Sequence, residues 1–346
     1  MVFGSFFSRK SRESGVAPVV DGKRSSLDVL ATLHRRPTSE EVIGLEDKHI
    51  LESAATLGLP IDREGMKPIF DIHEKALPLI EHAMAGLLKT DQAFQSYYPL
   101  ARDGEIIYDA LWALGRATGS TLQRRVHYTK TSNAMKSVRE VAPEYFYGIG
   151  ISPERAKNGP PMVFIDSGFW GSLFGAIARW TGIPTSSIPN DNFRGYMVCC
   201  QNSSYNQLAL PKDTKGAKEF LKMIAGSPIY KDASCGADLP NRLCSYIQLM
   251  PKYTGRFVQT VKVDGKWDVM PQENKYVSDN IREGRTTNDR CVGNNSDQIN
   301  SLSDKLSHVN ADVVDPVASI LLQRRTLEYF SDPNVHDRVY SRSKVY

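Results

Sequence analysis

The sequence has no long apolar run, no cysteine pair of the metal-binding type and no strong excess of charge of one sign. None of its five cysteines makes a CxxC pair, so neither a zinc site nor a disulfide framework is expected. No apolar run approaches the roughly 20 residues of a membrane span. With 43 basic against 39 acidic side chains, the net charge of +4 argues against nucleic acid as the main partner. The cysteine usage favours a reducing compartment, and we expect a cytoplasmic protein without a transmembrane segment.

Several catalytic signatures are also missing from the chain. It contains no Walker loop, no HExxH, no nucleophile elbow and no Ser-His-Asp order. Its 346 residues are 41% hydrophobic and 24% charged, which suits one large domain or two modest ones with a core of normal size.

Composition divides the chain into segments that we expect to differ in structure. Their ranges are a disordered tail at 1–37, a helical region at 38–90, an α/β domain at 91–282 with a hairpin at 257–270, a polar loop at 283–311, a helix at 312–331 and a basic tail at 332–346. The segments 1–37 and 283–311 hold too few apolar groups to offset the entropy of ordering, so both should lie outside the packed core. The sequence begins with MVFGSFFSRKSR, and the apolar part of this stretch is too short for a secretory signal. An interfacial anchor or an organelle presequence is the alternative to a disordered tail.

The middle of the chain alternates between strand and helix patterns. PMVFID is a continuous apolar run of the kind that is buried on both faces of a parallel sheet, and RRVHYTKTS and YMVCCQ read as further strands. Such alternation predicts a doubly wound, mostly parallel α/β sheet of Rossmann-like type. FVQTVKVDGKWDVM alternates around Asp264-Gly265, a two-residue turn, and predicts an antiparallel hairpin that forms an edge or a small lid.

The loop in VFIDSGFWGS joins a predicted strand to a helix and has the features of an anion site. A helix start presents free N–H groups, and Gly168 and Gly171 would let an anion approach the backbone, with Ser172 adding a hydroxyl. Asp166 lies at the carboxyl end of the strand, where ligands bind in open α/β sheets. The alternative is a tight turn in which the glycines serve the backbone and Asp166 bonds nearby amides.

A second loop has the same placement. PLARDGEIIYDAL puts Arg102, Asp103 and Gly104 at another helix start. Because neighbouring parallel strands end at one edge of a sheet, both loops should open on one crevice. Arg102 could then bind a phosphate or pyrophosphate with two hydrogen bonds, and Lys130 would supply a second cation. Here too a structural turn is the alternative, with Asp103 as the helix cap.

Two further side chains near these loops have both a functional and a structural interpretation. His127 ends a predicted strand and is the best-placed histidine for proton transfer, although a strand-end histidine can be purely structural. Trp170, inside the glycine loop, needs either an apolar seat or a ligand on which to stack.

The order of LARDG, VHYTKTSN and VFIDSGFWGS resembles the plan of type I phosphoribosyltransferases. It is also similar to a domain that accompanies haloacid-dehalogenase-type hydrolase domains in bacterial proteins and carries an ARDG turn and a DxGWxGT loop. The resemblance covers residues 92–200 and implies that the first loop contacts pyrophosphate and the second holds a ribose 5-phosphate. Ser167 follows Asp166 where the transferase loop has a second acid, and the chain has no DxDxT motif.

We therefore expect a phosphorylated sugar or nucleotide in a crevice between loops 101–104 and 166–172. The protein would be a transferase of phosphoribosyl or glycosyl type, or a non-catalytic ligand-sensing or scaffold protein on the same fold. Asp166 and His127 are the catalytic candidates, Mg²⁺ is the cofactor we consider, and no metal-ligand motif is found. The candidate ligand-binding residues are Arg102, Asp103, Gly104, Lys130, Ser167, Gly168, Phe169, Trp170, Gly171 and Ser172.

Overall fold

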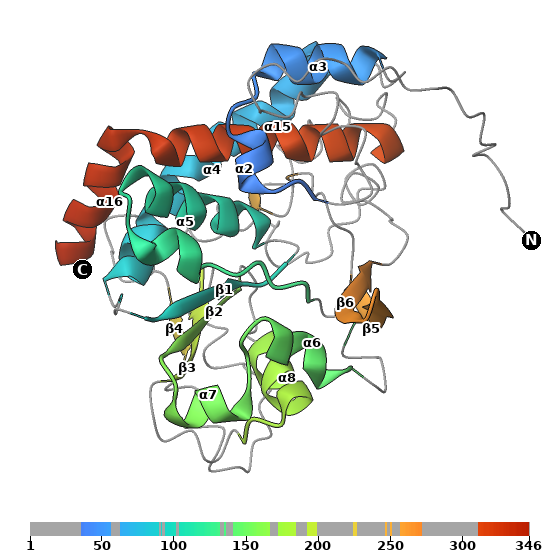
Figure 1. Ribbon diagram of the computed structural model, residues 1–346. Helices are drawn as coiled ribbons and strands as arrows, with labels where there is room; N and C mark the ends of the chain where they lie inside the picture. The colour runs from blue at the N-terminus through green and yellow to red at the C-terminus, as the bar shows by residue number, and fades with distance from the viewer. Residues whose placement is uncertain are drawn as a thin grey trace, which may run out of the picture.

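The centre of the molecule is a parallel sheet (Figure 1). Its strands follow one another in chain order: β1 (Ser96–Pro99), β2 (Met162–Asp166), β3 (Phe193–Met197) and β4 (Ile224–Gly226). Residues 126–129, here called the bridge segment, lie beside β1 on the side away from β2. Tyr97 pairs with Val163 of β2 and also with Val126, both in the parallel sense.

The computed structural model describes most of the chain, and every structural statement below concerns these residues. They are 36–56, 63–89, 91, 94–101, 104–131, 135, 141–166, 172–184, 192–198, 224–226, 246–247, 250, 257–271 and 311–345.

Helices cover both faces of the sheet (Figure 1). The layer on one face holds α2 (Ser39–Val42), α3 (Asp47–Thr56), α4 (Arg63–Leu88), α5 (Glu105–Ala117), α15 (Ala311–Ser331) and α16 (Pro333–Val345). The other face carries α6 (Pro143–Gly148), α7 (Pro153–Asn158) and α8 (Ser172–Thr181). A short 3-10 helix, η1 (Thr121–Arg125), precedes the bridge segment.

Strand residues alternate between the two faces, as the pleat requires. Val163 and Ile165 pack with α4, α5 and α15, whereas Phe164 packs with α6 and α8 on the opposite face. The rings of Phe164 and Phe193 are 4.4 Å apart between centroids. The apolar run PMVFID is therefore a strand buried on both faces, as predicted. The coarse prediction of an α/β protein with a parallel sheet is confirmed.

The N-terminal helical region differs from the expected pattern in one detail. Thr38 is the N-cap of α2, and it forms a capping box with Glu41, so the expected start of the helix is confirmed. The sequence pattern from Thr38 to Gly58 predicts one helix, whereas the structure has two, α2 and α3, which are separated by residues 43–46.

Within the segment expected as a basic tail at 332–346, residues 333–345 form the helix α16, which the sequence analysis did not expect. Val335 and Val339, one turn apart, are both buried. Arg338 and Arg342 donate to the carboxylate of Glu81 on α4, which is 2% exposed at its side chain. Apolar packing and this buried acid therefore hold a segment whose charge suggested a solvated tail.

The expected boundary at residue 37 is also displaced. Arg36 is buried and paired with Asp109 of α5, and the carbonyl of Pro37 accepts a hydrogen bond from Gln323 of α15. The packed structure thus includes the end of the predicted tail. Residues 1–35 and the predicted polar loop from 283 to 310 lie outside the described residues, whereas the predicted helix at 312–331 is confirmed as α15.

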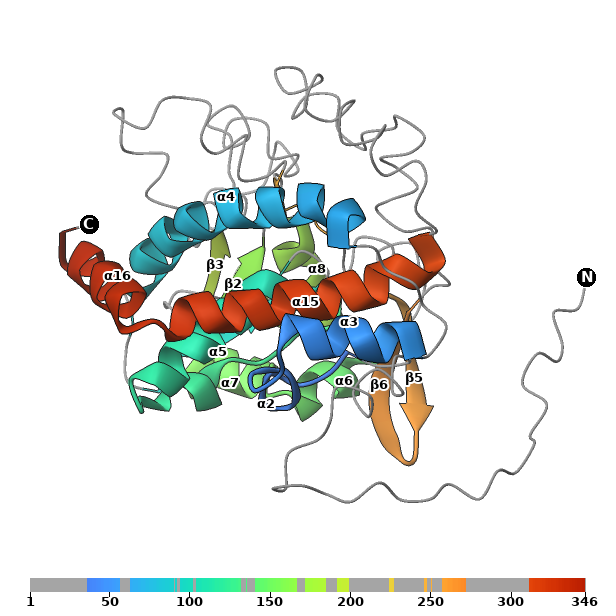
Figure 2. The same cartoon turned by 90° about the horizontal axis from the view of Figure 1, so that it is seen from above.

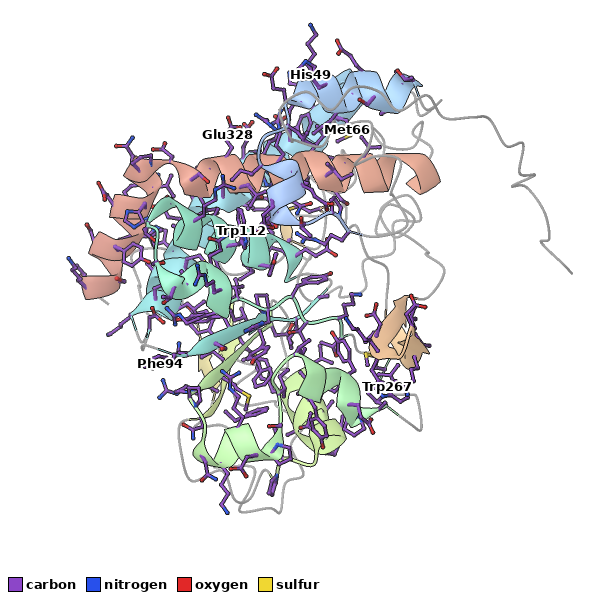
Figure 3. All side chains as sticks on the ribbon, in the orientation of Figure 1. His49, Met66, Phe94, Trp112, Trp267 and Glu328 are labelled. Atoms are coloured by element: carbon purple, nitrogen blue, oxygen red, sulfur yellow. The ribbon has the colours of Figure 1, made fainter. Side chains whose placement is uncertain are left out.

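A separate two-stranded sheet consists of β5 (Phe257–Val263) and β6 (Lys266–Pro271). Asp264 and Gly265 have φ values of 49° and 79°, the conformation that a two-residue hairpin turn of type I′ requires. The hairpin is therefore as predicted, but it pairs with no strand of the parallel sheet among the described residues. It lies beside the layers (Figure 2). Figure 3 shows its Trp267 far from Phe94, which precedes the amino end of β1.

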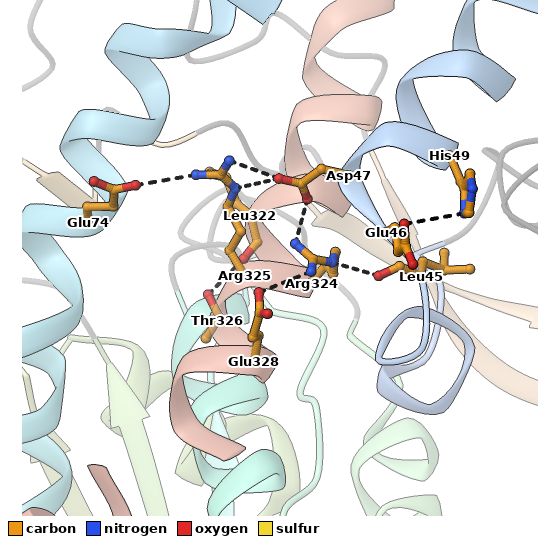
Figure 4. A network of polar contacts seen from close by, with 10 residues as sticks. All are labelled: Leu45, Glu46, Asp47, His49, Glu74, Leu322, Arg324, Arg325, Thr326 and Glu328. Atoms are coloured by element: carbon orange, nitrogen blue, oxygen red, sulfur yellow. Dashed lines mark hydrogen bonds and ion pairs between the residues drawn. The ribbon is translucent and has the colours of Figure 1, made fainter. Parts of the chain in front are cut away.

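Charged groups join α3 and α4 to α15 (Figure 4). Asp47 accepts hydrogen bonds from Arg324 at 2.7 Å and from Arg325 at 2.8 Å. Arg325 also reaches Glu74 of α4 at 3.4 Å, and its guanidinium lies 3.6 Å from the ring centroid of Phe70. These contacts fix α15 against α3 and α4.

Candidate functional site

The ends of three parallel elements meet at one edge of the sheet. The N–H of Leu100 donates to Ile165 of β2 at 2.8 Å, and the N–H of Ala101 donates to Thr129 of the bridge segment at 2.9 Å. The turn at 101–104, the bridge segment and the end of β2 therefore lie side by side. We call this the carboxyl edge. Both candidate loops begin there, as the topology argument required.

Gly104 is required by the packing of the turn itself. It is the N-cap of α5, and its N–H donates to the carbonyl of Leu100 at 2.9 Å. A Cβ on Gly104 would lie 2.4 Å from that carbonyl oxygen. The helix cap is thus Gly104 rather than Asp103, and Arg102 and Asp103 lie outside the described residues.

Asp166 is the last residue of β2 and is half-buried at the carboxyl edge. It lies opposite Met197 of β3 in the parallel register. The first residue of α8 is Ser172, so this helix begins at the same edge, although the placement of the Ser172 side chain is outside what the structure describes. Residues Ser167, Gly168, Phe169, Trp170 and Gly171 also lie outside the described residues.

Lys130 follows the bridge segment and already has an anionic partner. Its Nζ donates to both carboxylate oxygens of Asp268 on β6, at 2.7 and 2.9 Å. The two side chains are 35% and 44% exposed, so water reaches the pair. The backbone N–H of Lys130 donates to the hydroxyl of Tyr145 at 2.8 Å, and burial raises the pKa of that tyrosine, which stays neutral. Sequence reasoning identified the cation but not this carboxylate.

Thr131, the next residue after Lys130, carries a buried hydroxyl. The residue is 0% exposed, and its Oγ1 has no hydrogen-bond partner among the described residues. A buried hydroxyl without a partner costs free energy, and such a group commonly marks the position of a water molecule or a ligand. It is the polar group at the carboxyl edge that points most directly to an additional molecule.

His127 lies farther from the carboxyl edge than the sequence suggested. Its ring stacks on Tyr98, with centroids 5.1 Å apart, on the face that carries α7. Burial lowers the pKa of His127, and the nearby charge of Arg155 lowers it further. Three extended residues, about 10 Å, separate it from Lys130. This placement favours the structural interpretation of His127.

An arginine that the sequence did not single out lies beneath the first turn of α5. Arg36 donates to Asp109 at 2.6 Å and lies 4.0 Å from Glu105. Its guanidinium lies over the rings of Tyr108 and Tyr128, at 5.3 and 5.1 Å from their centroids. The available signal was two acids, Glu105 and Asp109, within a helix that is otherwise apolar on that face.

The carboxylate of Asp109 is buried and accepts several hydrogen bonds. It also accepts from Ser39 at 3.2 Å and from Gln323 at 3.3 Å. Burial raises the pKa of Asp109 to about 6 in spite of the opposing effect of Arg36. The hydroxyl of Tyr128 donates to Glu105 at 2.9 Å. This network therefore connects the segment before α2, the start of α5 and the bridge segment.

The described residues contain no group of three His, Cys, Asp or Glu side chains arranged to hold a metal ion. Within the same part of the chain, no helix combines the length and the apolar character that crossing a bilayer requires. A scan against protein-family models, a search of curated proteins and a search of solved structures gave no match to this chain.

Proposed function

We propose that the chain binds a phosphorylated sugar or nucleotide at the carboxyl edge, between the turn at 101–104 and the loop at 166–172. One observation carries the proposal. The bridge segment lies on one side of β1 and β2 on the other, so the order of successive strands changes direction at β1. In doubly wound sheets ligands bind outside the carboxyl ends of the strands at such a switch point. We propose the doubly wound arrangement for this sheet on the same ground.

Groups suited to a phosphate surround this switch point. The helices α5 and α8 both begin at the carboxyl edge, and free N–H groups at helix starts favour anions. Lys130 supplies a cation, and the buried hydroxyl of Thr131 supplies a hydrogen bond that has no partner among the described residues. Arg102 and residues 167–171 would add the contacts that the sequence suggested.

Asp166 is the candidate for the sugar. Two strand spacings, about 10 Å, separate the bridge segment from β2, so a phosphate near Lys130 would leave room for a sugar near Asp166. A single carboxylate is compatible with Mg²⁺, which commonly binds one or two carboxylates together with substrate phosphates. Transfer of phosphoribosyl or glycosyl type would use these groups for positioning and charge stabilisation.

A second candidate function is a non-catalytic ligand sensor or scaffold on the same fold. The observation that favours it is the ion pair between Lys130 and Asp268, which engages the cation that a substrate would need. The stacking of His127 against Tyr98 also places this candidate for proton transfer away from the carboxyl edge.

The test is a thermal-shift and calorimetric screen with ribose 5-phosphate and adenosine 5′-monophosphate, with and without Mg²⁺. Ribose and adenosine serve as matched ligands without phosphate. A phosphorylated compound far above its Kd should stabilise the fold by a few kcal/mol, about 2.7 at a hundredfold excess over Kd. Asp166→Asn and Lys130→Met should each weaken binding about tenfold or more, because each removes a charge-assisted contact. Equal effects of ribose and ribose 5-phosphate would overturn the proposal.

Turnover separates the two candidates. If a phosphorylated ligand binds, incubation with phosphoribosyl pyrophosphate and a panel of nucleobases should yield a nucleotide and release pyrophosphate when the chain is a phosphoribosyltransferase. Binding without product formation, at saturating ligand and Mg²⁺, would favour the sensor or scaffold.

A further inference from the structure

We infer that Asp268 is an internal competitor for the ligand's phosphate, and that a bound phosphate releases the β5–β6 hairpin from Lys130. The inference rests on the proposed function and adds the regulation and the selectivity of the same site. It starts from the way the hairpin is attached to the rest of the protein.

Few contacts hold the hairpin to the body of the protein among the described residues. The side chain of Val269 is inserted into the core between the sheet and α6, and the hydroxyl of Thr260 accepts a hydrogen bond from the N–H of Ala142 at 2.8 Å. The third contact is the ion pair of Asp268 with Lys130. The hairpin thus has one apolar anchor, one backbone contact and one electrostatic contact.

The electrostatic contact lies at the candidate phosphate position. A carboxylate that presents both oxygens to an ammonium group resembles two oxygens of a phosphate. Asp268 therefore occupies the place that an anionic ligand would take at Lys130. Both side chains are partly exposed, so the pair can open without burying an isolated charge.

The competition implies selectivity for ligand charge. A monoanion such as acetate carries the same charge as Asp268 and has no advantage over an intramolecular partner. A phosphate dianion carries more charge and therefore competes better than a carboxylate for the ammonium group of Lys130. The carboxylate would thus exclude simple carboxylic acids and admit phosphates.

Movement of the hairpin follows from the same geometry. When phosphate takes Lys130, the charge of Asp268 is left beside an anion, and like charges at that distance repel. The hairpin then keeps only Val269 and Thr260 as attachments among its described contacts. The hydrogen bond from the N–H of Ala142 to the hydroxyl of Thr260 should then open more often, while the internal hairpin pairing remains.

The experiment compares Asp268→Asn with Asp264→Asn, which changes the same charge at the exposed hairpin turn. The asparagine of the first variant would keep an oxygen for the N–H of Val269, which Asp268 Oδ1 accepts at 2.8 Å, so the local hydrogen bond survives. Inorganic phosphate is the probe, measured by calorimetry on the full chain. Asp268→Asn should tighten phosphate binding at least about fivefold, the effect of one unit charge about 4 Å away in bulk water. Asp264→Asn should change the affinity less than about twofold, because its charge is farther from Lys130 and screened by solvent.

Two further measurements complete the test. Adding Lys130→Met to Asp268→Asn should abolish the gain, and amide exchange at Ala142, whose N–H donates to Thr260, should rise in wild-type protein when phosphate is added. If wild-type protein binds phosphate but Asp268→Asn binds no tighter than Asp264→Asn, the competitor inference is wrong while the proposed function stands. If phosphate and the phosphorylated sugars bind none of the variants, both proposals are wrong.

Discussion

Replacing Arg36 with methionine would leave the carboxylate of Asp109 buried without its cation. The two side chains are 9% and 2% exposed, and their closest N and O atoms are 2.6 Å apart. Removing one partner of a buried ion pair typically costs about 3–5 kcal/mol, because the other charge is left without compensation. Ser39 and Gln323 remain as donors to Asp109, so we expect a loss near the lower end of that range.

The pH dependence gives this prediction its specific signature. Burial raises the pKa of Asp109 to about 6, above the unfolded value of about 3.9. The folded protein therefore binds this proton more readily than the unfolded chain, and stability falls as pH rises between those two values. Without Arg36 the folded pKa rises further, so the fall continues to higher pH. The difference between wild type and Arg36→Met should thus be larger at about pH 8 than at about pH 5.

Urea unfolding followed by circular dichroism at several pH values measures this difference. Arg124→Met, at an exposed arginine of η1, is the matched control and should be close to neutral. Adding Asp109→Asn to Arg36→Met should recover much of the loss, because the uncompensated charge is removed. The reasoning would be refuted if the stability loss of Arg36→Met did not depend on pH. It would also be refuted if the losses of Arg36→Met and Asp109→Asn were additive in the double variant.

Three further predictions concern single positions. Gly104→Ala should destabilise the fold by about 1–3 kcal/mol, because the new Cβ meets the carbonyl of Leu100 at 2.4 Å. Glu81→Gln should lower the free energy of unfolding by about 1.5–3 kcal/mol and raise amide exchange in α16, because it weakens the charge-assisted hydrogen bonds from Arg338 and Arg342. His127→Phe should reduce the loss of stability on acidification below about pH 6.5: the lowered folded pKa means that the unfolded chain binds this proton first.

Each of these changes has a matched control in the same chain. Gly148→Ala introduces a Cβ with no heavy atom within 4 Å, Glu74→Gln alters a carboxylate that is 66% exposed, and His49→Phe alters a histidine that is 56% exposed. A glycine, acid or histidine variant that behaves like its control, in urea unfolding or in its pH profile, would contradict the corresponding prediction.

The elements that the sequence predicted best are those whose signal is local. The apolar run of β2 and the hairpin at Asp264-Gly265 each depend on a few adjacent residues. The positive φ of Gly265 shows why the chain turns at this position. Local chemistry of this kind can be read without knowledge of the rest of the fold.

The errors arose where a distant residue decides the outcome. Arg338 and Arg342 suggested a solvated tail, yet they are neutralised by Glu81, more than 250 positions earlier in the chain. Arg36 looked like the end of a disordered segment, but its partner Asp109 is 73 positions away. No composition window contains both members of such a pair. A start signal for α16 was nevertheless visible, because Asp332 directly precedes the helix, Pro333 is its first residue, and Asp332 accepts the N–H of Asn334.

In the candidate site, too, the sequence predicted the arrangement of the strand ends but not the interaction partners of the side chains. The meeting of the two loops at one edge followed from the rule that parallel strands end together, and the strand ends do lie side by side. The partner of Lys130 did not follow, because Asp268 belongs to a hairpin 138 positions later. Sequence reasoning therefore located the edge and its cation but could not detect the anion already bound to that cation.

Buried acids determine how the helical layer is arranged around this edge. Glu81 accepts hydrogen bonds from α15 and α16, and Asp109 accepts them from α15 and from the segment before α2. Apolar packing alone would tolerate a sliding of one helix along another, whereas a displaced acid would lose its donors in a dry environment. Since Asp109 lies one turn into α5, the helix that starts at Gly104, the same bonds fix the position of the turn at the carboxyl edge. The segment before α2 and the helix α15 therefore both contribute to the geometry of the carboxyl edge, although both are distant from it in the sequence.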